Sequence, residues 1–234
     1  MAKKSDSPVI IDTVQIALFP NEFKIQSASE LQAELLSKGF IKSDKLIINT
    51  FPENFPQDVV RIDAQLNKYD VNIKIAPAKI SLYWGNKAHD ENFSINLEEV
   101  TKVLGEAYDL IKDLKDKTFN RVGYITTIYK KISNPETLIR KVLDVKNKNE
   151  IRDGKLVLTY NWKPSNAKWK NVRFNKHVTT GTGLANKDKA ILIQYDLNTH
   201  QENKLQWQLA NVQAFIKEAS GISSRPNKVY SEFF

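Results

Sequence analysis

Residues 168–178 carry side chains whose types and spacing suit the binding of a polyanion. If Val172 and Phe174 face a core, strand alternation places the intervening planar and polar side chains on the opposite face. These are Trp169, Asn171, Arg173, Asn175 and His177. Such groups stack on nucleobases and hydrogen-bond to base edges. The alternative is a solvated edge strand whose lysines discourage aggregation and whose tryptophan packs under a loop.

Lysines in and around this segment are the expected phosphate contacts, because an ammonium group neutralises a phosphate without reading sequence. They are Lys163, Lys168, Lys170, Lys176, Lys187 and Lys189. Between them, residues 179–189 contain two glycines, three threonines and two lysines. Backbone N–H groups there could cradle a phosphate, although no Gly-Lys-Ser/Thr motif follows. The alternative is a mobile hairpin loop.

Residues that would support catalysis do not converge in the sequence. The chain has no cysteine, which excludes disulfides, thiolate metal sites and cysteine nucleophiles. Asp12 followed by Glu22 and Lys24 is the nearest approach to a metal-dependent nuclease set, but residues 21–26 have the composition of a loop. The histidines, His89, His177 and His200, are far apart. We therefore expect no catalytic residue, no metal and no cofactor.

Three aromatic residues at the C-terminus form a predicted docking element. They are Tyr230, Phe233 and Phe234. Pro226 cannot continue a preceding helix, so the chain is expected to leave it extended. Such apolar side chains either pack on their own domain or insert into a protein partner.

Charge is distributed unevenly along the chain. Residues 1–117 hold 15 basic and 18 acidic residues, a net charge of −3, whereas residues 118–234 hold 20 and 9, a net charge of +11. Residues 140–189 hold 13 basic and 4 acidic residues, together with Tyr160, Trp162 and Phe174. Positive charge interleaved with planar side chains indicates a nucleic-acid partner.

Composition is that of a globular protein, with 41% hydrophobic and 26% charged residues. The N-terminal residues are polar and no apolar run reaches about 18 residues. These features predict a cytoplasmic protein without a membrane partner.

Elements of the first half follow from hydrophobic periodicity. Residues 9–19 read as a strand, and a capping box at Ser27 and Glu30 opens a helix that ends before Gly39. Three alternating segments follow, at 60–66, 71–75 and 80–84. Asn96 then caps a helix, whose apolar positions are 97, 100, 104, 107, 111 and 114.

The second half is predicted to repeat this order. A strand at 119–131 precedes a helix that begins at Asn134-Pro135. Alternating segments at 156–162, 168–178 and 190–197 precede a closing helix at 205–220. Both halves, 1–117 and 118–234, therefore read β-α-β-β-β-α. We expect an α+β fold in which duplicated halves form a curved antiparallel sheet with helices on one face.

This element order resembles the duplicated saddle of the TATA-box-binding protein, but the intercalating phenylalanine pairs of that family have no counterpart at matching positions. The chain also resembles a sporadically distributed, uncharacterised bacterial family. The residues that carry this likeness are Pro8-Val9-Ile10-Ile11, Asn120-Arg121-Val122-Gly123-Tyr124 and the phenylalanine-rich C-terminus. That resemblance implies a component of an anti-phage defence assembly.

The leading hypothesis is a non-catalytic binding protein whose basic second half contacts nucleic acid and whose acidic first half faces a protein partner. One alternative is a protein–protein scaffold or adaptor without a nucleic-acid role. The other is a divergent metal-dependent nuclease. Salt dependence of binding separates the first two hypotheses, and dependence on a divalent metal separates the third.

Overall fold

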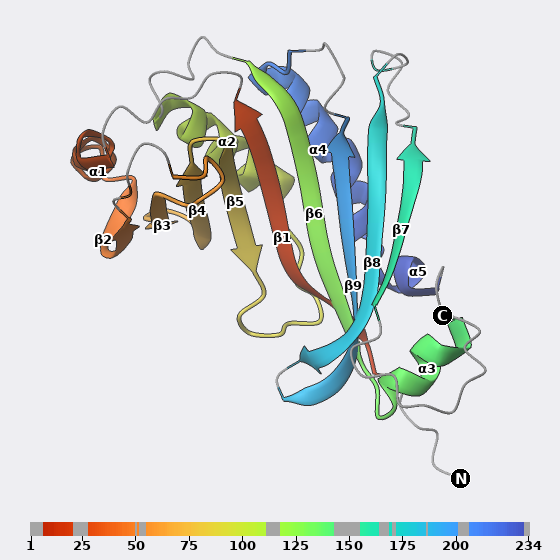
Figure 1. Ribbon diagram of the computed structural model, residues 1–234. Coiled ribbons are helices and arrows are strands. Elements are labelled where there is room, and N and C mark those ends of the chain that lie inside the picture. The colour runs from red at the N-terminus through yellow and green to blue at the C-terminus, as the bar shows by residue number, and fades with distance from the viewer. Residues whose placement is uncertain are drawn as a thin grey trace.

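The computed structural model describes residues 7–20, 28–49, 51, 55–110, 118–142, 155–163, 169, 172–185, 187–200 and 206–231. Within them, nine strands form one antiparallel sheet in the order β2-β3-β4-β5-β1-β6-β9-β8-β7 (Figure 1). The strands are β1 (Val9–Pro20), β2 (Ile41–Ile48), β3 (Ile62–Leu66), β4 (Val71–Ala76), β5 (Lys79–Gly85), β6 (Phe119–Lys131), β7 (Lys155–Trp162), β8 (Phe174–Ala185) and β9 (Asp188–Thr199). The helices are α1 (Ala28–Ser37), α2 (Leu97–Leu110), α3 (Pro135–Val142), α4 (Leu209–Ser223) and α5 (Pro226–Ser231).

Strands of the two halves follow the same order outward from the central β1/β6 pair. Beyond β1 lie β5, β4, β3 and β2, and beyond β6 lie β9, β8 and β7. The predicted α+β class with an antiparallel sheet is confirmed. Strand β2 is additional to the prediction, because its central Ser43, Asp44 and Lys45 are exposed and interrupt the hydrophobic alternation. Its pairing with β3 shifts register between Ile41 and Leu46.

One face of the sheet forms the core beneath the helices. In β1, Val14 and Ile16 are fully buried, while Gln15 between them is only partly buried. Leu35 of α1, Val103 of α2, Ile139 of α3 and Phe215 of α4 belong to the same hydrophobic cluster. Figure 1 shows α2 and α4 behind the strands, so the viewer sees the other face of the sheet. We call that other face the open face.

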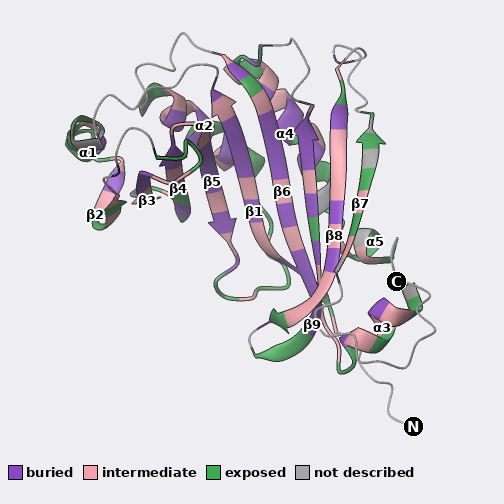
Figure 2. Cartoon of the chain, viewed as in Figure 1, coloured by how far each residue is buried: buried purple, intermediate pink, exposed green. Residues whose placement is uncertain are grey.

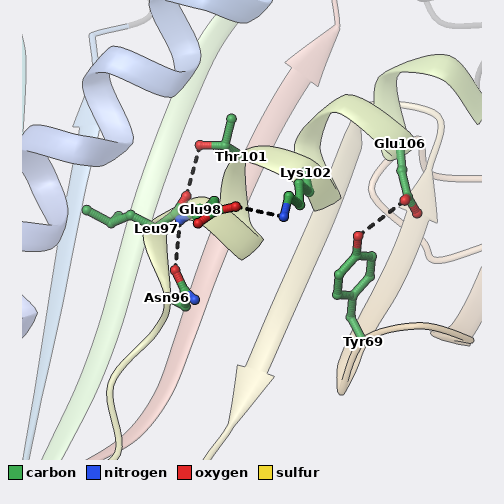
Figure 3. A network of polar contacts seen from close by, with 7 residues as sticks. All are labelled: Tyr69, Asn96, Leu97, Glu98, Thr101, Lys102 and Glu106. Atoms are coloured by element: carbon green, nitrogen blue, oxygen red, sulfur yellow. Dashed lines mark hydrogen bonds and ion pairs between the residues drawn. The ribbon is translucent and has the colours of Figure 1, made fainter.

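Helix α2 begins where the sequence predicts. The Asn96 side-chain Oδ1 accepts a hydrogen bond from the Glu98 backbone N–H at 2.9 Å, which is an N-cap (Figure 3). Val100, Val103, Leu104 and Ala107 are buried against the sheet. On the outer surface, the Lys102 ammonium lies 2.7 Å from the Glu98 carboxylate. The predicted core-facing stripe of this helix is therefore confirmed at Val100, Leu104 and Ala107, whereas its first predicted position, Leu97, is exposed.

The chain after α4 differs from the prediction. Pro226 is the first residue of the short helix α5 rather than the start of an extended tail. This is physically reasonable, because proline lacks only an N–H that the first turn of a helix leaves unpaired. Tyr230 on α5 is partly buried and packs against the core cluster.

The glycine-rich segment also differs from the prediction, because residues 179–185 continue strand β8 instead of forming a loop. Its glycines make room for packing: a Cβ atom at Gly183 would lie 2.5 Å from Leu192 Cδ1. The connection to β9 is short, and Lys187 within it has a φ of 70°. The described residues of 179–189 therefore do not form a phosphate cradle. None of the helices among the described residues is long and apolar enough to cross a membrane.

Candidate nucleic-acid interface

The open face is polar across most of its width, because strand alternation assigns the apolar residues to the core. Figure 2 shows partly buried and exposed residues alternating with buried ones along the central strands. At one level across β1, β6, β9 and β8 the register aligns Thr13, Thr127, Gln194 and Thr179. These hydroxyl and amide groups are hydrogen-bond donors and acceptors without formal charge.

Basic side chains from both halves meet in one row where the strands end. Arg121 pairs with Phe19 of β1, and Lys79 pairs with Ala76 of β4. Backbone hydrogen bonds extend the ladder at both sides: Arg61 N–H donates to Ile75 at 2.8 Å, and the Arg173 carbonyl accepts from His200 at 2.9 Å. The core residues next to the basic ones face the helices, so alternation turns the basic residues to the open face. We call this set the basic row: Arg61, Lys79, Arg121, His200, Arg173 and Lys163.

Two arginines of the basic row lie over aromatic rings. The Arg61 guanidinium carbon is 4.8 Å from the Phe51 ring centroid and 5.8 Å from that of Phe55. These two rings stack at 4.6 Å and are 38% and 39% exposed. The Arg121 guanidinium lies 4.9 Å from the Phe19 ring. Cation–π contacts of this kind orient a guanidinium plane and leave aromatic surface beside it.

Hydrogen-bonding capacity remains on both arginines, and Arg61 is a buried residue with 8% of its surface exposed. Nη1 of Arg61 and Nε of Arg121 are buried and have no hydrogen-bond partner among the described residues. Buried polar groups are usually paired, so these two N–H groups are exceptions.

Two further levels of the open face lie next to the basic row and are rich in amides. The first level carries Asp63, Lys74, Ser81, Asn198, Asn175 and Asn161, and the second carries Gln65, Asn72, Tyr83, Gln15, Asp196, His177 and Thr159. We call them the amide rows. Their carboxylates have partners: Asp63 lies 2.9 Å from the Lys74 ammonium, and Asp196 accepts from Asn198 Nδ2 at 2.9 Å.

Trp169, predicted to lie on an exposed strand face, is instead part of the core. Its side chain is 3% exposed, and its ring centroid lies 5.6 Å from that of Trp207 and 6.3 Å from that of Phe215. The prediction assumed one continuous strand from residue 168, whereas β8 begins at Phe174. Alternation therefore does not apply to Trp169, and the indole buries its large apolar surface against α4.

Three predicted residues lie within β8 itself. Asn175 and His177 are on the open face, as predicted, and Nδ1 of His177 is 3.0 Å from the Thr159 hydroxyl. Lys176 turns to the other side, where its ammonium lies 5.0 Å from the ring centroid of the buried Tyr195. Lys176 is therefore separate from the basic row.

The remaining predicted lysines do not form one patch. Lys163 is exposed at the same sheet end as Arg173, in the basic row. Lys187 lies at the opposite end of β8, which over 12 residues is roughly 40 Å long. Lys189, also at that far end, lies 3.3 Å from Glu136 of α3. The structure thus divides the lysines between two ends of the molecule.

Several predicted residues lie outside the described part of the chain. They are Lys168, Lys170, Asn171, Glu22, Lys24, Phe233 and Phe234. Tyr230 is described, and the Lys130 ammonium lies 4.8 Å from its ring. Tyr230 therefore docks on its own domain.

Asp12, His89 and Tyr129 form a titratable cluster at the other end of the sheet. A register shift between Ile11 and Thr13 marks the position of Asp12, and burial raises the pKa of its carboxyl while the charge of His89 opposes that shift. His89 has a φ of 53°, and its Nδ1 lies 3.0 Å from the Tyr129 hydroxyl. Strain and bulges are often found at functional sites. Tyr129, however, is only 1% exposed, so its hydroxyl is out of reach of a substrate.

The described residues contain no group of three histidine or acidic side chains that could hold a metal ion. Among the described residues, the charged partner that acts on the pKa of Asp12 is His89. The geometry around Asp12 therefore does not support the nuclease hypothesis over the described part of the chain.

Sequence reasoning missed Arg61, Lys79 and Arg121. Lys79 follows Arg61 by 18 residues and Arg121 follows Lys79 by 42, and they come from both halves, so no local charge cluster marks them. The one available signal is that each lies near the start of a predicted strand: Arg61 immediately precedes β3, Lys79 begins β5, and Arg121 is the third residue of β6. The strand order and register must be known before one can recognise that these residues align in a row.

The geometry of the open face is the basis for inferring what the protein does. No protein-family model matches the chain, and no curated protein matches it in sequence.

Proposed function

We propose that this protein is a non-catalytic nucleic-acid-binding protein and that it binds a single strand along the basic row of its open face. The observation that carries the proposal is the alignment of Arg61, Lys79, Arg121, Arg173 and Lys163 at one end of the sheet. Arg61, Lys79, Arg121 and Arg173 come from different elements of the sequence but align at one level of the ladder, and Lys163 directly follows the last paired residue of β7. A linear polyanion is the partner that a linear array of cations fits.

Dimensions of the row agree with a short single strand. Seven strand spacings separate β3 from β7, so the row is about 34 Å long. With about 3.4 Å of rise per nucleotide of one strand, that length corresponds to about ten nucleotides. Phosphates would contact the basic row, and bases would lie over the amide rows.

Side chains of the amide rows suit base contact. Asn175, Asn161 and Asn72 offer amide groups, which hydrogen-bond to base edges. Tyr83 and His177 offer rings, as does Phe19 at the level of the basic row, and such rings stack on bases irrespective of sequence. The negative charge of Asp63 is offset by the Lys74 ammonium, and Asp196 accepts a hydrogen bond from Asn198.

Matching strand order on the two sides of the β1/β6 pair supports an origin of the sheet by internal duplication. In that case each half would supply part of the basic row: Arg61 and Lys79 from the first, and Arg121, Arg173 and Lys163 from the second. The acidic first half would then take part in binding as well.

Salt dependence tests the proposed function. Three fluorescently labelled probes are titrated with the protein between about 50 and 200 mM salt. They are single-stranded DNA, single-stranded RNA and duplex DNA, each about ten nucleotides long. Three to five phosphate contacts predict that the logarithm of affinity falls by about 2 to 3.5 per decade of salt for a single strand. Absence of binding to every probe, or affinity that is independent of salt, would overturn the proposal and favour the scaffold alternative.

A further inference from the structure

A cleft on the open face lies within the first half, at the level of the amide rows. Its volume is about 280 Å³, and it lies between β4, β5 and β1. The lining residues that matter here are Thr13, Asn72, Lys74, Tyr83, Gly85 and Lys87. Lys79 of the basic row and Tyr83 are on the same face of β5, four residues and thus about 13 Å apart. Bases of a strand held by Lys79 would extend over the amide rows toward this cleft.

Gly85 keeps the cleft open. A Cβ atom at this position would meet no atom within 4 Å, so neighbouring side chains leave the space unfilled. Gly39 is the described glycine with a positive φ, and Gly85 has an ordinary backbone conformation. Neither packing nor backbone geometry therefore requires glycine here, and a larger side chain would extend into the cleft without strain.

An aromatic ring and an amide face this space. Tyr83 is directly opposite Asn72 in the ladder, and the Asn72 side chain is exposed. The Lys74 ammonium lies 5.6 Å from the Tyr83 ring centroid. Lys74 pairs with Ser81, whereas Gly85 follows Tyr83 by two residues, so the two lie on opposite sides of Tyr83 along the strand. Along the strand, Tyr83 is therefore flanked by Lys74 on one side and by the unfilled space at Gly85 on the other.

Charged groups at the rim are already paired. The Lys87 ammonium lies 2.5 Å from Asp70 Oδ1, which also accepts from Gln65 Nε2 at 2.8 Å. The cleft therefore suits a planar, uncharged ligand with hydrogen-bonding edges better than it suits a free anion or cation.

We propose that this cleft receives one nucleobase, adenine in preference to pyrimidines, from the strand held by the basic row; this inference rests on the proposed function. The Asn72 amide offers one donor and one acceptor, which match N7 and the N6 amino group of adenine. Tyr83 supplies the stacking surface. The volume is just below the usual range for small-molecule sites, which suits a base better than a larger ligand.

The test uses two variants and a matched control. Gly85→Leu fills the cleft, and Asn72→Ala removes the amide. Gly105→Leu is the control, because a Cβ atom at Gly105 would likewise meet no neighbouring atom within 4 Å, and this glycine lies on α2 in the helix layer. Two labelled strands of about ten nucleotides are compared by anisotropy, one containing adenine and one made only of pyrimidines.

For the wild type we expect the adenine-containing strand to bind about tenfold tighter or more. Gly85→Leu should reduce the affinity for this strand to that for the pyrimidine strand and leave pyrimidine binding unchanged. Asn72→Ala should remove the adenine preference, and Gly105→Leu should change neither affinity. Adenosine monophosphate, titrated against labelled protein by NMR, should shift the backbone amide signal of Gly85 and the side-chain amide signals of Asn72.

Failure of the cleft and failure of the proposed function give different results. In one case both strands bind in a salt-dependent way, with no adenine preference and no NMR shifts at Gly85. That result would overturn the proposed role of the cleft and retain the proposed function. Shifts at Gly85 without binding of either strand would retain the cleft as a nucleotide site and overturn the proposed function. If neither strand binds and no NMR shifts appear at Gly85, both the cleft proposal and the proposed function are overturned.

Discussion

The helix-covered face and the open face of the sheet are built from alternate residues of the same strands, yet they differ in chemistry. Along β1, Val14 and Ile16 are fully buried under helices, while Gln15 hydrogen-bonds to Ser81 on the open face at 3.2 Å. Burial of the apolar face supplies the main driving force for folding. The amides and cations of the open face do not belong to that apolar core. They are therefore informative about binding rather than about folding.

The two halves show a second contrast, between charge along the chain and charge in space. The first half is acidic and the second is strongly basic. Nevertheless, Arg61 and Lys79 of the acidic half align with Arg121 and Arg173 of the basic half. Net charge of a segment therefore indicates the class of partner, whereas strand register determines where the charge is presented.

Replacing Trp169 by alanine is expected to have the largest effect, and the effect should be on the core. Loss of the buried indole should lower the free energy of unfolding by about 3–5 kcal/mol. Chemical denaturation measures this change. Affinity for a single strand, measured where the variant is folded, should be unchanged. Full stability combined with weaker binding would instead place Trp169 at the binding surface.

Charge reversal distinguishes the open face from the helix layer. The variant Lys79→Glu, Lys163→Glu, Arg173→Glu should weaken single-strand binding by about a hundredfold or more, which is about 2.7 kcal/mol. Its matched control reverses Lys141, Lys217 and Lys228, which are exposed on α3, α4 and α5. That control should lose much less affinity because only long-range charge changes. Equal losses in the two triple variants would mean that binding depends on net charge alone.

Removing the cap of α2 should weaken the helix layer and leave the open face intact. Asn96→Ala deletes the acceptor for the Glu98 N–H and should lower the free energy of unfolding by about 1 kcal/mol. Thermal or chemical denaturation reports this loss, with Asn96→Asp as the control that keeps an acceptor. A clear change in affinity for a single strand would show that the two faces are coupled.

Asp12 should have the smallest effect, and it should appear as a pH dependence. Burial raises the pKa of Asp12 above its ordinary value of 3.8, so the native state holds this proton more tightly than the unfolded chain. Stability of the wild type should therefore decline as pH rises from about 3.8 through the native pKa. Asp12→Asn removes that decline, and denaturation curves at several pH values compare the two proteins. Parallel pH profiles would contradict the raised pKa.

Much of the fold could be predicted from periodicity and capping. Alternation in β3 to β5 and the three- and four-residue spacing in α2 both reflect burial of one face, and they are visible without coordinates. Strand β2 could not be predicted, because its middle is exposed on both sides of the pleat. Pro226 was interpreted as ending a helix, whereas the same constraint on φ also allows it to begin one.

The candidate site was less predictable than the fold. Alternation correctly assigned Asn175 and His177 to the open face, because both lie inside a regular strand. It failed for Trp169, which lies outside that strand. Arg61, Lys79 and Arg121 required knowledge of which strands are neighbours, and no single segment encodes that order.

The central claim is that nucleic acid lies on the open face, and photo-crosslinking tests it most directly. A single strand of about ten nucleotides with photoreactive bases is irradiated with the wild-type protein, and the crosslinked peptides are identified by mass spectrometry. We predict crosslinks to open-face side chains of β1, β5 and β8, with Phe19, Tyr83 and His177 as the main sites. Crosslinks confined to α2 and α4 would contradict the account, because those helices cover the opposite face of the sheet.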